Sequence, residues 1–168
     1  MTFNWAVLVA YAVKTGTVST PLFILYLGLI FWTVGYDTIY ACQDIEDDAM
    51  VGIKSTARKF GGRVKLGVGV CYLIFFCLIT GVWVSGVDTL QQFYLDRKAP
   101  NIIHHSMYSS PYTYIPAIWP GLQLIKQVVG IQIDDPVKNL FIFKTNVWQA
   151  ILWLIAAAGF GLIAIAST

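Results

Sequence analysis

Long apolar stretches separated by short polar connections dominate this chain. The longer stretches approach or exceed the roughly 18–20 residues that a helix needs to cross a bilayer. The short alternating segments of a membrane β-barrel are not seen. The pattern therefore predicts an all-α, multi-pass transmembrane helical bundle. It forms a single domain over residues 1–168, with spans at about 3–18, 21–40, 64–87, 112–130 and 147–166.

Two of these predicted spans have features that set them apart. The stretch 3–18 is short for a span, has no basic leader, and reads as the back half of a helix whose front is missing. The stretch 112–130 contains Pro116 and Pro120, which predicts a kinked or partly interfacial helix. Between the third and fourth spans, residues 88–113 form a polar connection with adjacent histidines His104 and His105, which we interpret as a surface pair.

Composition agrees with a membrane environment. Hydrophobic residues make up 57% of the chain and charged residues 12%, about half the roughly 25% of a soluble domain. The net charge of +2 gives no reason to expect nucleic-acid binding. Cys42, Cys71 and Cys77 lack metal-ligand spacing and indicate packing rather than a disulfide framework.

Lysine and arginine positions predict the orientation. One side of the predicted bundle holds most of them, and the other has Lys14, Arg97 and Lys98. Because cytoplasmic loops carry the excess of positive charge, we expect the 37–65 connection to be cytoplasmic. The richer side comprises Lys54, Arg58, Lys59, Arg63 and Lys65, together with Lys126, Lys138 and Lys144.

The acidic segment that ends the second span is the candidate site. If that helix continues past Ile39, then Asp37, Tyr40, Asp44 and Asp48 fall at i, i+3, i+7 and i+11, on one face. Carboxylates at a membrane edge are costly, so they are functional candidates. Mg²⁺ would remove their mutual repulsion, because it prefers a few carboxylate oxygens together with water and phosphate oxygens. Lys54, Arg58 and Lys59 follow directly and could hold phosphate.

Other interpretations of this segment differ in strength. An ordinary solvated acidic patch where a helix leaves the membrane remains open. An EF-hand loop starting at Asp44 would require glycine where Ala49 stands. A zinc site would require clustered cysteines or histidines.

Residues 36–61, YDTIYACQDIEDDAMVGIKSTARKFG, resemble the second aspartate-rich motif of the UbiA prenyltransferase family. The stretch Asp135-Pro136 … Asn139-Leu140 … Phe143 … Asn146 also resembles the last cytoplasmic loop of that family. The tyrosine-aspartate-threonine start is typical of members that act on 4-hydroxybenzoate in ubiquinone biosynthesis. The matched motif positions are Tyr36, Asp37, Thr38, Asp44, Asp48, Gly52, Lys54, Ser55 and Thr56.

The resemblance implies Mg²⁺-dependent transfer of a polyprenyl group from polyprenyl diphosphate to the ring of 4-hydroxybenzoate. It implies that Asp44 and Asp48 bind Mg²⁺, with Asp47 as an alternative to Asp48. Asp37 then orients substrate or stabilises the prenyl cation, and Tyr40 shields that cation or simply packs. Lys54 and Arg58 contact the diphosphate. The implied location is a bacterial or mitochondrial inner membrane.

The sequence also departs from the family. Members have nine membrane helices and a first motif of the form Asn-Asp-x-x-Asp-x-x-x-Asp, which is absent from these 168 residues. We therefore expect the C-terminal half of an enzyme, completed by a missing N-terminal half. The alternatives are a member with another aromatic or quinone-precursor acceptor, a truncated fragment, or a small membrane subunit that binds diphosphate lipids without chemistry.

Overall fold

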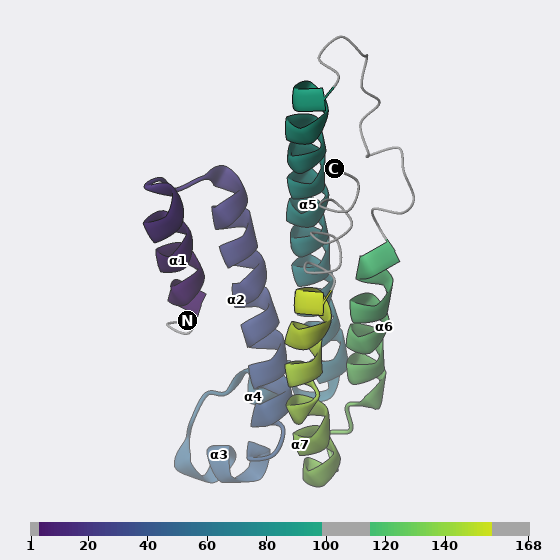
Figure 1. Ribbon diagram of the computed structural model, residues 1–168. Coiled ribbons are helices and arrows are strands. Elements are labelled where there is room, and N and C mark those ends of the chain that lie inside the picture. Colours follow the sequence, from purple (N-terminus) through teal and green to yellow (C-terminus); the bar gives the residue numbers. More distant parts are fainter. Residues whose placement is uncertain (1–3, 99–114, 156–168) are drawn as a thin grey trace.

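The computed structural model describes residues 4–98 and 115–155, with side chains for 4–86 and 115–155, and this part of the chain is helical apart from short connections (Figure 1). The helices are α1 (Trp5–Thr15), α2 (Thr20–Ala41), α3 (Ile45–Val51), α4 (Thr56–Phe60), α5 (Val64–Lys98), α6 (Ile115–Gly130) and α7 (Pro136–Lys144), with a 3-10 turn at Gly61–Arg63 and a last helical segment at 146–155.

The helices run up and down beside one another (Figure 1). Helix α2 descends to the end of the bundle where α3 and α4 lie, and α5 leads away from it. Helix α6 returns to the same end, and α7 leads away again. Residues 42–63 and 131–135 therefore share one end, which we call the polar end.

Among the residues that the structure describes, two helical stretches are long and apolar enough to cross a membrane, as judged by length and composition. They are Thr20–Ala41 and the stretch Thr56–Gly86, which contains α4 and most of α5. Large apolar side chains such as Phe23, Leu73 and Trp119 are more than half exposed in the bundle, as expected for surfaces that face lipid. For the described residues, the predicted all-α fold class is confirmed.

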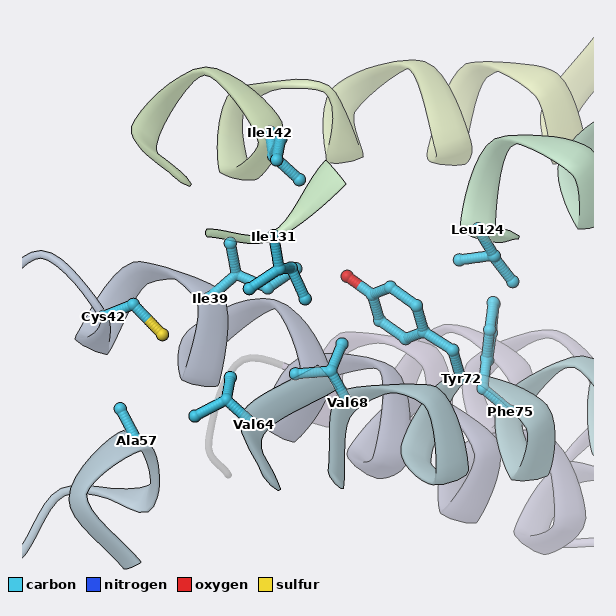
Figure 2. Close-up of a cluster of buried hydrophobic side chains, with 10 residues drawn as sticks. All are labelled: Ile39, Cys42, Ala57, Val64, Val68, Tyr72, Phe75, Leu124, Ile131 and Ile142. Carbon is cyan, nitrogen blue, oxygen red and sulfur yellow. The ribbon is translucent and has the colours of Figure 1, made fainter. Parts of the chain in front are cut away.

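A buried cluster near the polar end holds the bundle together (Figure 2). It draws on α2, α4, α5, α6 and α7, so burial of one apolar core fixes five helices at once. Its members are Ile39, Cys42, Ala57, Val64, Val68, Tyr72, Phe75, Leu124, Ile131 and Ile142.

Glycines allow α2 and α5 to approach closely. A Cβ on Gly28 would lie 3.4 Å from the Leu78 Cβ, and one on Gly35 would lie 2.5 Å from Tyr72 Cε1. The two glycines are seven residues apart and thus face the same side of α2. Small residues at such contacts are typical of membrane helices that pack backbone against side chain.

One boundary expected from the sequence differs in the structure. The polar connection predicted from residue 88 was wrong in its first part, because α5 continues to Lys98. The physical reason is that residues 88–98 contain neither glycine nor proline and are rich in helix formers such as leucine and glutamine. The histidine pair His104–His105 and most of the predicted span 147–166 lie outside the described residues.

Candidate functional site at the polar end

The last turns of α2 present two of the predicted residues to the outside. Asp37 and Tyr40 are both exposed and lie three residues apart, while Thr38 and Ile39 between them are completely buried. The buried pair anchors this turn in the core. Asp37 and Tyr40 therefore lie on the side of α2 that faces away from the packed interface.

The acidic segment does not continue α2, which corrects the expectation of a single helical face. Helix α2 ends at Ala41, and Asp44 occupies the position just before α3, without a capping hydrogen bond from its side chain. The physical reason is helix polarity. Glu46, Asp47 and Asp48 occupy the first turn of α3, where the helix dipole favours negative charge, whereas at the C-terminus of a longer α2 it would oppose them.

Cys42 fixes the turn between the two helices. Its side chain is 2% exposed, and its Sγ donates a hydrogen bond to the Thr38 carbonyl at 3.2 Å. Burial raises the pKa of the Cys42 thiol to about 11, so this cysteine stays neutral at physiological pH. Cys42 is therefore a buried packing residue next to the acidic segment rather than a reactive group.

The carboxylates that the sequence predicted to bind metal lie at the start of α3. Asp44 and Asp48 are one turn apart, joined through the backbone by the Asp48 N–H to Asp44 carbonyl hydrogen bond of 2.7 Å. Asp44 and Asp47 are exposed and Asp48 is half-buried. In the part of the chain that the structure describes, no three acidic, histidine or cysteine side chains form a group that could hold a metal ion.

Two carboxylates still fit the chemistry of Mg²⁺. This ion usually takes one or two protein carboxylates and completes its shell with water and phosphate oxygens. The exposed Asp44 and the half-buried Asp48 offer that donor set, and Asp47 is close enough in sequence to replace one member. The residues present therefore suit a metal that arrives with a diphosphate, rather than one held by a protein cage.

Arg58 is the basic residue with the most defined contacts. Its Nη1 donates to the Asp48 carbonyl at 3.0 Å and also to the Ile53 carbonyl. These carbonyls belong to the middle of α3 and to the connection that follows it, so the guanidinium links α4 to the acidic helix. Lys54, the other residue predicted to contact diphosphate, is exposed on the same connection.

A hydroxyl contact ties the far end of this segment to α2. Thr38 Oγ1 lies 2.9 Å from Thr56 Oγ1, and Ser55 caps α4 by accepting from the Arg58 backbone N–H at 3.4 Å. Gly52 ends α3 with φ of 80°, a left-handed conformation that suits glycine. The glycine, serine and threonine of the sequence motif thus shape the loop that carries the acids.

Aromatic rings line α2 beside the acidic turn. Trp32, Tyr36 and Tyr40 are spaced by four residues, so they stack along one side of the helix. Trp32 and Tyr36 meet edge to face with centroids 5.4 Å apart. Phe143 from α7 packs against both tyrosines, at 5.9 Å from Tyr36 and 5.0 Å from Tyr40.

The second polar loop reaches the same end of the bundle. Asp135 caps α7 by accepting from the Lys138 backbone N–H at 2.9 Å. The Asn139 side chain is fully buried and exchanges two hydrogen bonds with the Gln132 backbone, at 3.1 and 2.6 Å. These contacts set the direction of α7, which carries Phe143 to the tyrosines.

Sequence reasoning singled out most of these residues but missed Trp32 and Tyr72. Both lie inside apolar spans, where an aromatic residue draws no attention. One signal was available, because the four-residue spacing of Trp32, Tyr36 and Tyr40 indicates an aromatic ladder. The contacts of Tyr72 span long sequence separations and gave no local signal.

Comparison with known proteins bears on this arrangement. A sequence model described as the UbiA prenyltransferase family matches residues 1–96. The chain is 31% identical over 152 residues to UbiA prenyltransferase claS of Ampulloclitocybe clavipes, covering 89% of this chain and 42% of that protein. It is 49% identical over 147 residues to the mitochondrial 4-hydroxybenzoate polyprenyltransferase of Aedes aegypti, covering 87% of this chain and 29% of that protein.

A bacterial relative gives a shorter match. The 4-hydroxybenzoate octaprenyltransferase of Vibrio parahaemolyticus is 38% identical over 82 residues, covering 49% of this chain and 29% of that protein. The chain thus spans less than half the length of these curated relatives. No solved structure matches.

Proposed function

The chain belongs to the UbiA prenyltransferase family, and from this premise we propose that it forms part of an enzyme that prenylates an aromatic ring. The donor is a polyprenyl diphosphate and the acceptor is 4-hydroxybenzoate, in ubiquinone biosynthesis. The observation that carries the proposal is the polar end itself. There the exposed Asp44 and Lys54 and the half-buried Asp48 follow the exposed Asp37 at the end of α2, in a family of membrane prenyltransferases.

The proposed roles follow from charge and position. Asp44 and Asp48, with Asp47 as the alternative to Asp48, would hold Mg²⁺, which supplies charge neutralisation for the diphosphate leaving group. The Lys54 ammonium attracts the diphosphate oxygens. Asp37 is exposed near the end of α2, the helix that precedes the metal-binding acids. There its carboxylate orients substrate or stabilises positive charge that develops on the prenyl carbon.

The reaction needs little covalent chemistry from the protein. The allylic carbon–oxygen bond breaks, and its electron pair leaves with the diphosphate. The ring carbon ortho to the phenol attacks the allylic carbon and then loses its proton. Tyr40 presents an exposed ring at this end, and an aromatic face attracts a cation by its quadrupole.

The substitution Asp44→Asn tests the metal role in a completed enzyme, meaning this chain co-expressed with the N-terminal half of the Aedes aegypti relative. We expect a large loss of prenyl transfer that extra Mg²⁺ partly restores. Glu46→Gln is the matched control, because Glu46 is an exposed acid on the same helix without a proposed role. Wild-type turnover in Asp44→Asn would refute the metal role.

An assay with and without the N-terminal half also distinguishes an enzyme from a binding protein. We expect membranes that contain only this chain to show no Mg²⁺-dependent prenylation, and addition of the N-terminal half to restore it. Binding of polyprenyl diphosphate without transfer in the completed form would support a non-catalytic membrane subunit instead. Faster transfer to another quinone precursor than to 4-hydroxybenzoate would reassign the acceptor.

A further inference from the structure

The carboxamide of Asn146 joins three helical elements inside the bundle. Its Oδ1 accepts from the Trp32 indole N–H of α2 at 3.1 Å and from the Tyr72 hydroxyl of α5 at 3.3 Å. Its Nδ2 donates to the Phe143 carbonyl of α7 at 3.0 Å. Asn146 itself is 8% exposed and follows the turn at Thr145 that separates α7 from the segment 146–155. Hydrogen bonds at a site of such low exposure are strong and costly to leave unmade.

The partners of Asn146 lead to the tyrosines that flank Asp37. Trp32 meets the Tyr36 ring edge to face at 5.4 Å and stacks on Phe75 of α5 at 5.6 Å. Phe143, whose carbonyl the Asn146 amide holds, contacts both Tyr36 and Tyr40. The Asn146 carboxamide is therefore connected to the aromatic rings beside the acidic turn in two ways, through Trp32 and through Phe143.

We call the hydrogen bonds of Asn146 to Trp32 and Tyr72 the tie. The packing around Tyr72 shows that the tie depends on a close fit. The Tyr72 ring projects from α5 among the buried side chains (Figure 2) and lies against Gly35 of α2, where a Cβ would come within 2.5 Å of it. An apolar residue in place of Asn146 could fill the volume. It would leave the Trp32 N–H and the Tyr72 hydroxyl without their acceptor.

We propose that Asn146 is a positioning residue of the site, which fixes the rings of Tyr36 and Tyr40 beside Asp37 through Trp32 and Phe143. It does so without touching substrate. The inference rests on the proposed function and adds a specific consequence. Loss of the tie should slow the transfer step more than it weakens binding of the metal or the diphosphate, because Tyr40, the ring proposed to face the prenyl cation, lies on α2, whereas the proposed metal ligands Asp44 and Asp48 lie at the start of α3.

A double-mutant cycle tests the tie without any need for activity. We expect Asn146→Leu and Trp32→Phe each to lower the unfolding temperature in detergent, and the double variant to lose clearly less than the two losses combined. Gln149→Leu is the matched control. The Gln149 amide is also buried, but it is placed to donate to the Pro120 carbonyl at 3.2 Å and to accept from the Trp153 indole at 3.1 Å, not from α2. Additive losses for Asn146 and Trp32 would overturn the tie.

Kinetics of the completed enzyme test the positioning role. For Asn146→Leu we expect kcat to fall about tenfold, the scale of one lost hydrogen bond. The KM for polyprenyl diphosphate and the Mg²⁺ concentration for half-activity should stay within twofold of wild type. Equal changes in all three, or none, would overturn the proposal. If the unsubstituted completed enzyme shows no prenyl transfer, the proposed function fails, whereas the double-mutant cycle still decides whether the tie exists.

Discussion

Gly35 shows how one residue sets the distance between two membrane helices. Its missing Cβ leaves room for the Tyr72 ring, whose Cε1 and Cδ1 would lie 2.5 and 2.7 Å from an added carbon. We predict that Gly35→Ala lowers the free energy of unfolding by about 1–3 kcal/mol, the usual effect of overpacking a filled core. Chemical denaturation in detergent, followed by circular dichroism, measures this change.

Gly81 provides the control for that prediction. It lies within α5, and an added Cβ there would meet nothing within 4 Å. Gly81→Ala should therefore leave stability unchanged or raise it by up to about 1 kcal/mol, since alanine favours a helix more than glycine does. Equal destabilisation by both substitutions would show that helix approach at Gly35 is not the cause.

Arg58 makes contacts that its predicted role as a diphosphate ligand did not include. Its Nη1 donates to one carbonyl within α3 and to one in the connection that follows it, and thereby holds the loop that carries the acids. We predict that Arg58→Gln increases cleavage at Glu46 and Asp47 by a protease specific for acidic residues. The expected increase is about fivefold, from roughly 1 kcal/mol of lost hydrogen bonding. Time courses resolved by mass spectrometry measure the cleavage rate.

The neighbouring Lys59 separates this contact from a general loss of positive charge. Lys59 is exposed on the same short helix, so Lys59→Gln removes the same charge and leaves the carbonyl contacts in place. We expect its cleavage rate to match that of the unsubstituted chain. Equal acceleration in both variants would indicate that charge, and not the contact of Arg58, holds the loop.

At the scale of elements, local signals predicted the helices better than their junctions. Thr20-Pro21 marks the start of α2 because proline suits a first helical turn, and the structure begins the helix at Thr20. The break after Ala41 was not predicted, because the spacing of the acids suits one continuous helix as well as two. The direction of the helix dipole decides between these alternatives, and spacing alone does not report it.

The C-terminal motif illustrates the other limit of sequence reasoning. Its residues were noted for their resemblance to a family, and the structure gives them separate tasks. Asp135 caps α7, Asn139 holds the Gln132 backbone, and Asn146 binds Trp32 across 114 residues of sequence. The first two contacts are local enough to be predicted. The last depends on how three helices pack, which no local pattern encodes.

At the scale of the whole molecule, charge and chemistry gather at one end. The acidic helix α3, the basic α4 and the connection from α6 to α7 lie together, and the turn between α1 and α2 lies at the other end (Figure 1). Most of the lysines and arginines flank the polar end, where a catalytic face would meet a charged diphosphate. By the positive-inside rule, this end should face the cytoplasm in a bacterial host or the matrix in a mitochondrion.

Cysteine labelling tests this orientation. In a variant without Cys42, Cys71 and Cys77, single cysteines replace the exposed residues Met50 and Val137 near the polar end and Thr17 at the opposite turn. In right-side-out vesicles we predict that a membrane-impermeant maleimide labels only the Thr17→Cys variant, and in inverted vesicles only the other two. Because a helical bundle fixes both polar loops on one side, Met50→Cys and Val137→Cys must respond together. Labelling of these two variants from opposite sides would contradict the arrangement of α2, α5, α6 and α7. Labelling of both in right-side-out vesicles would contradict only the predicted orientation.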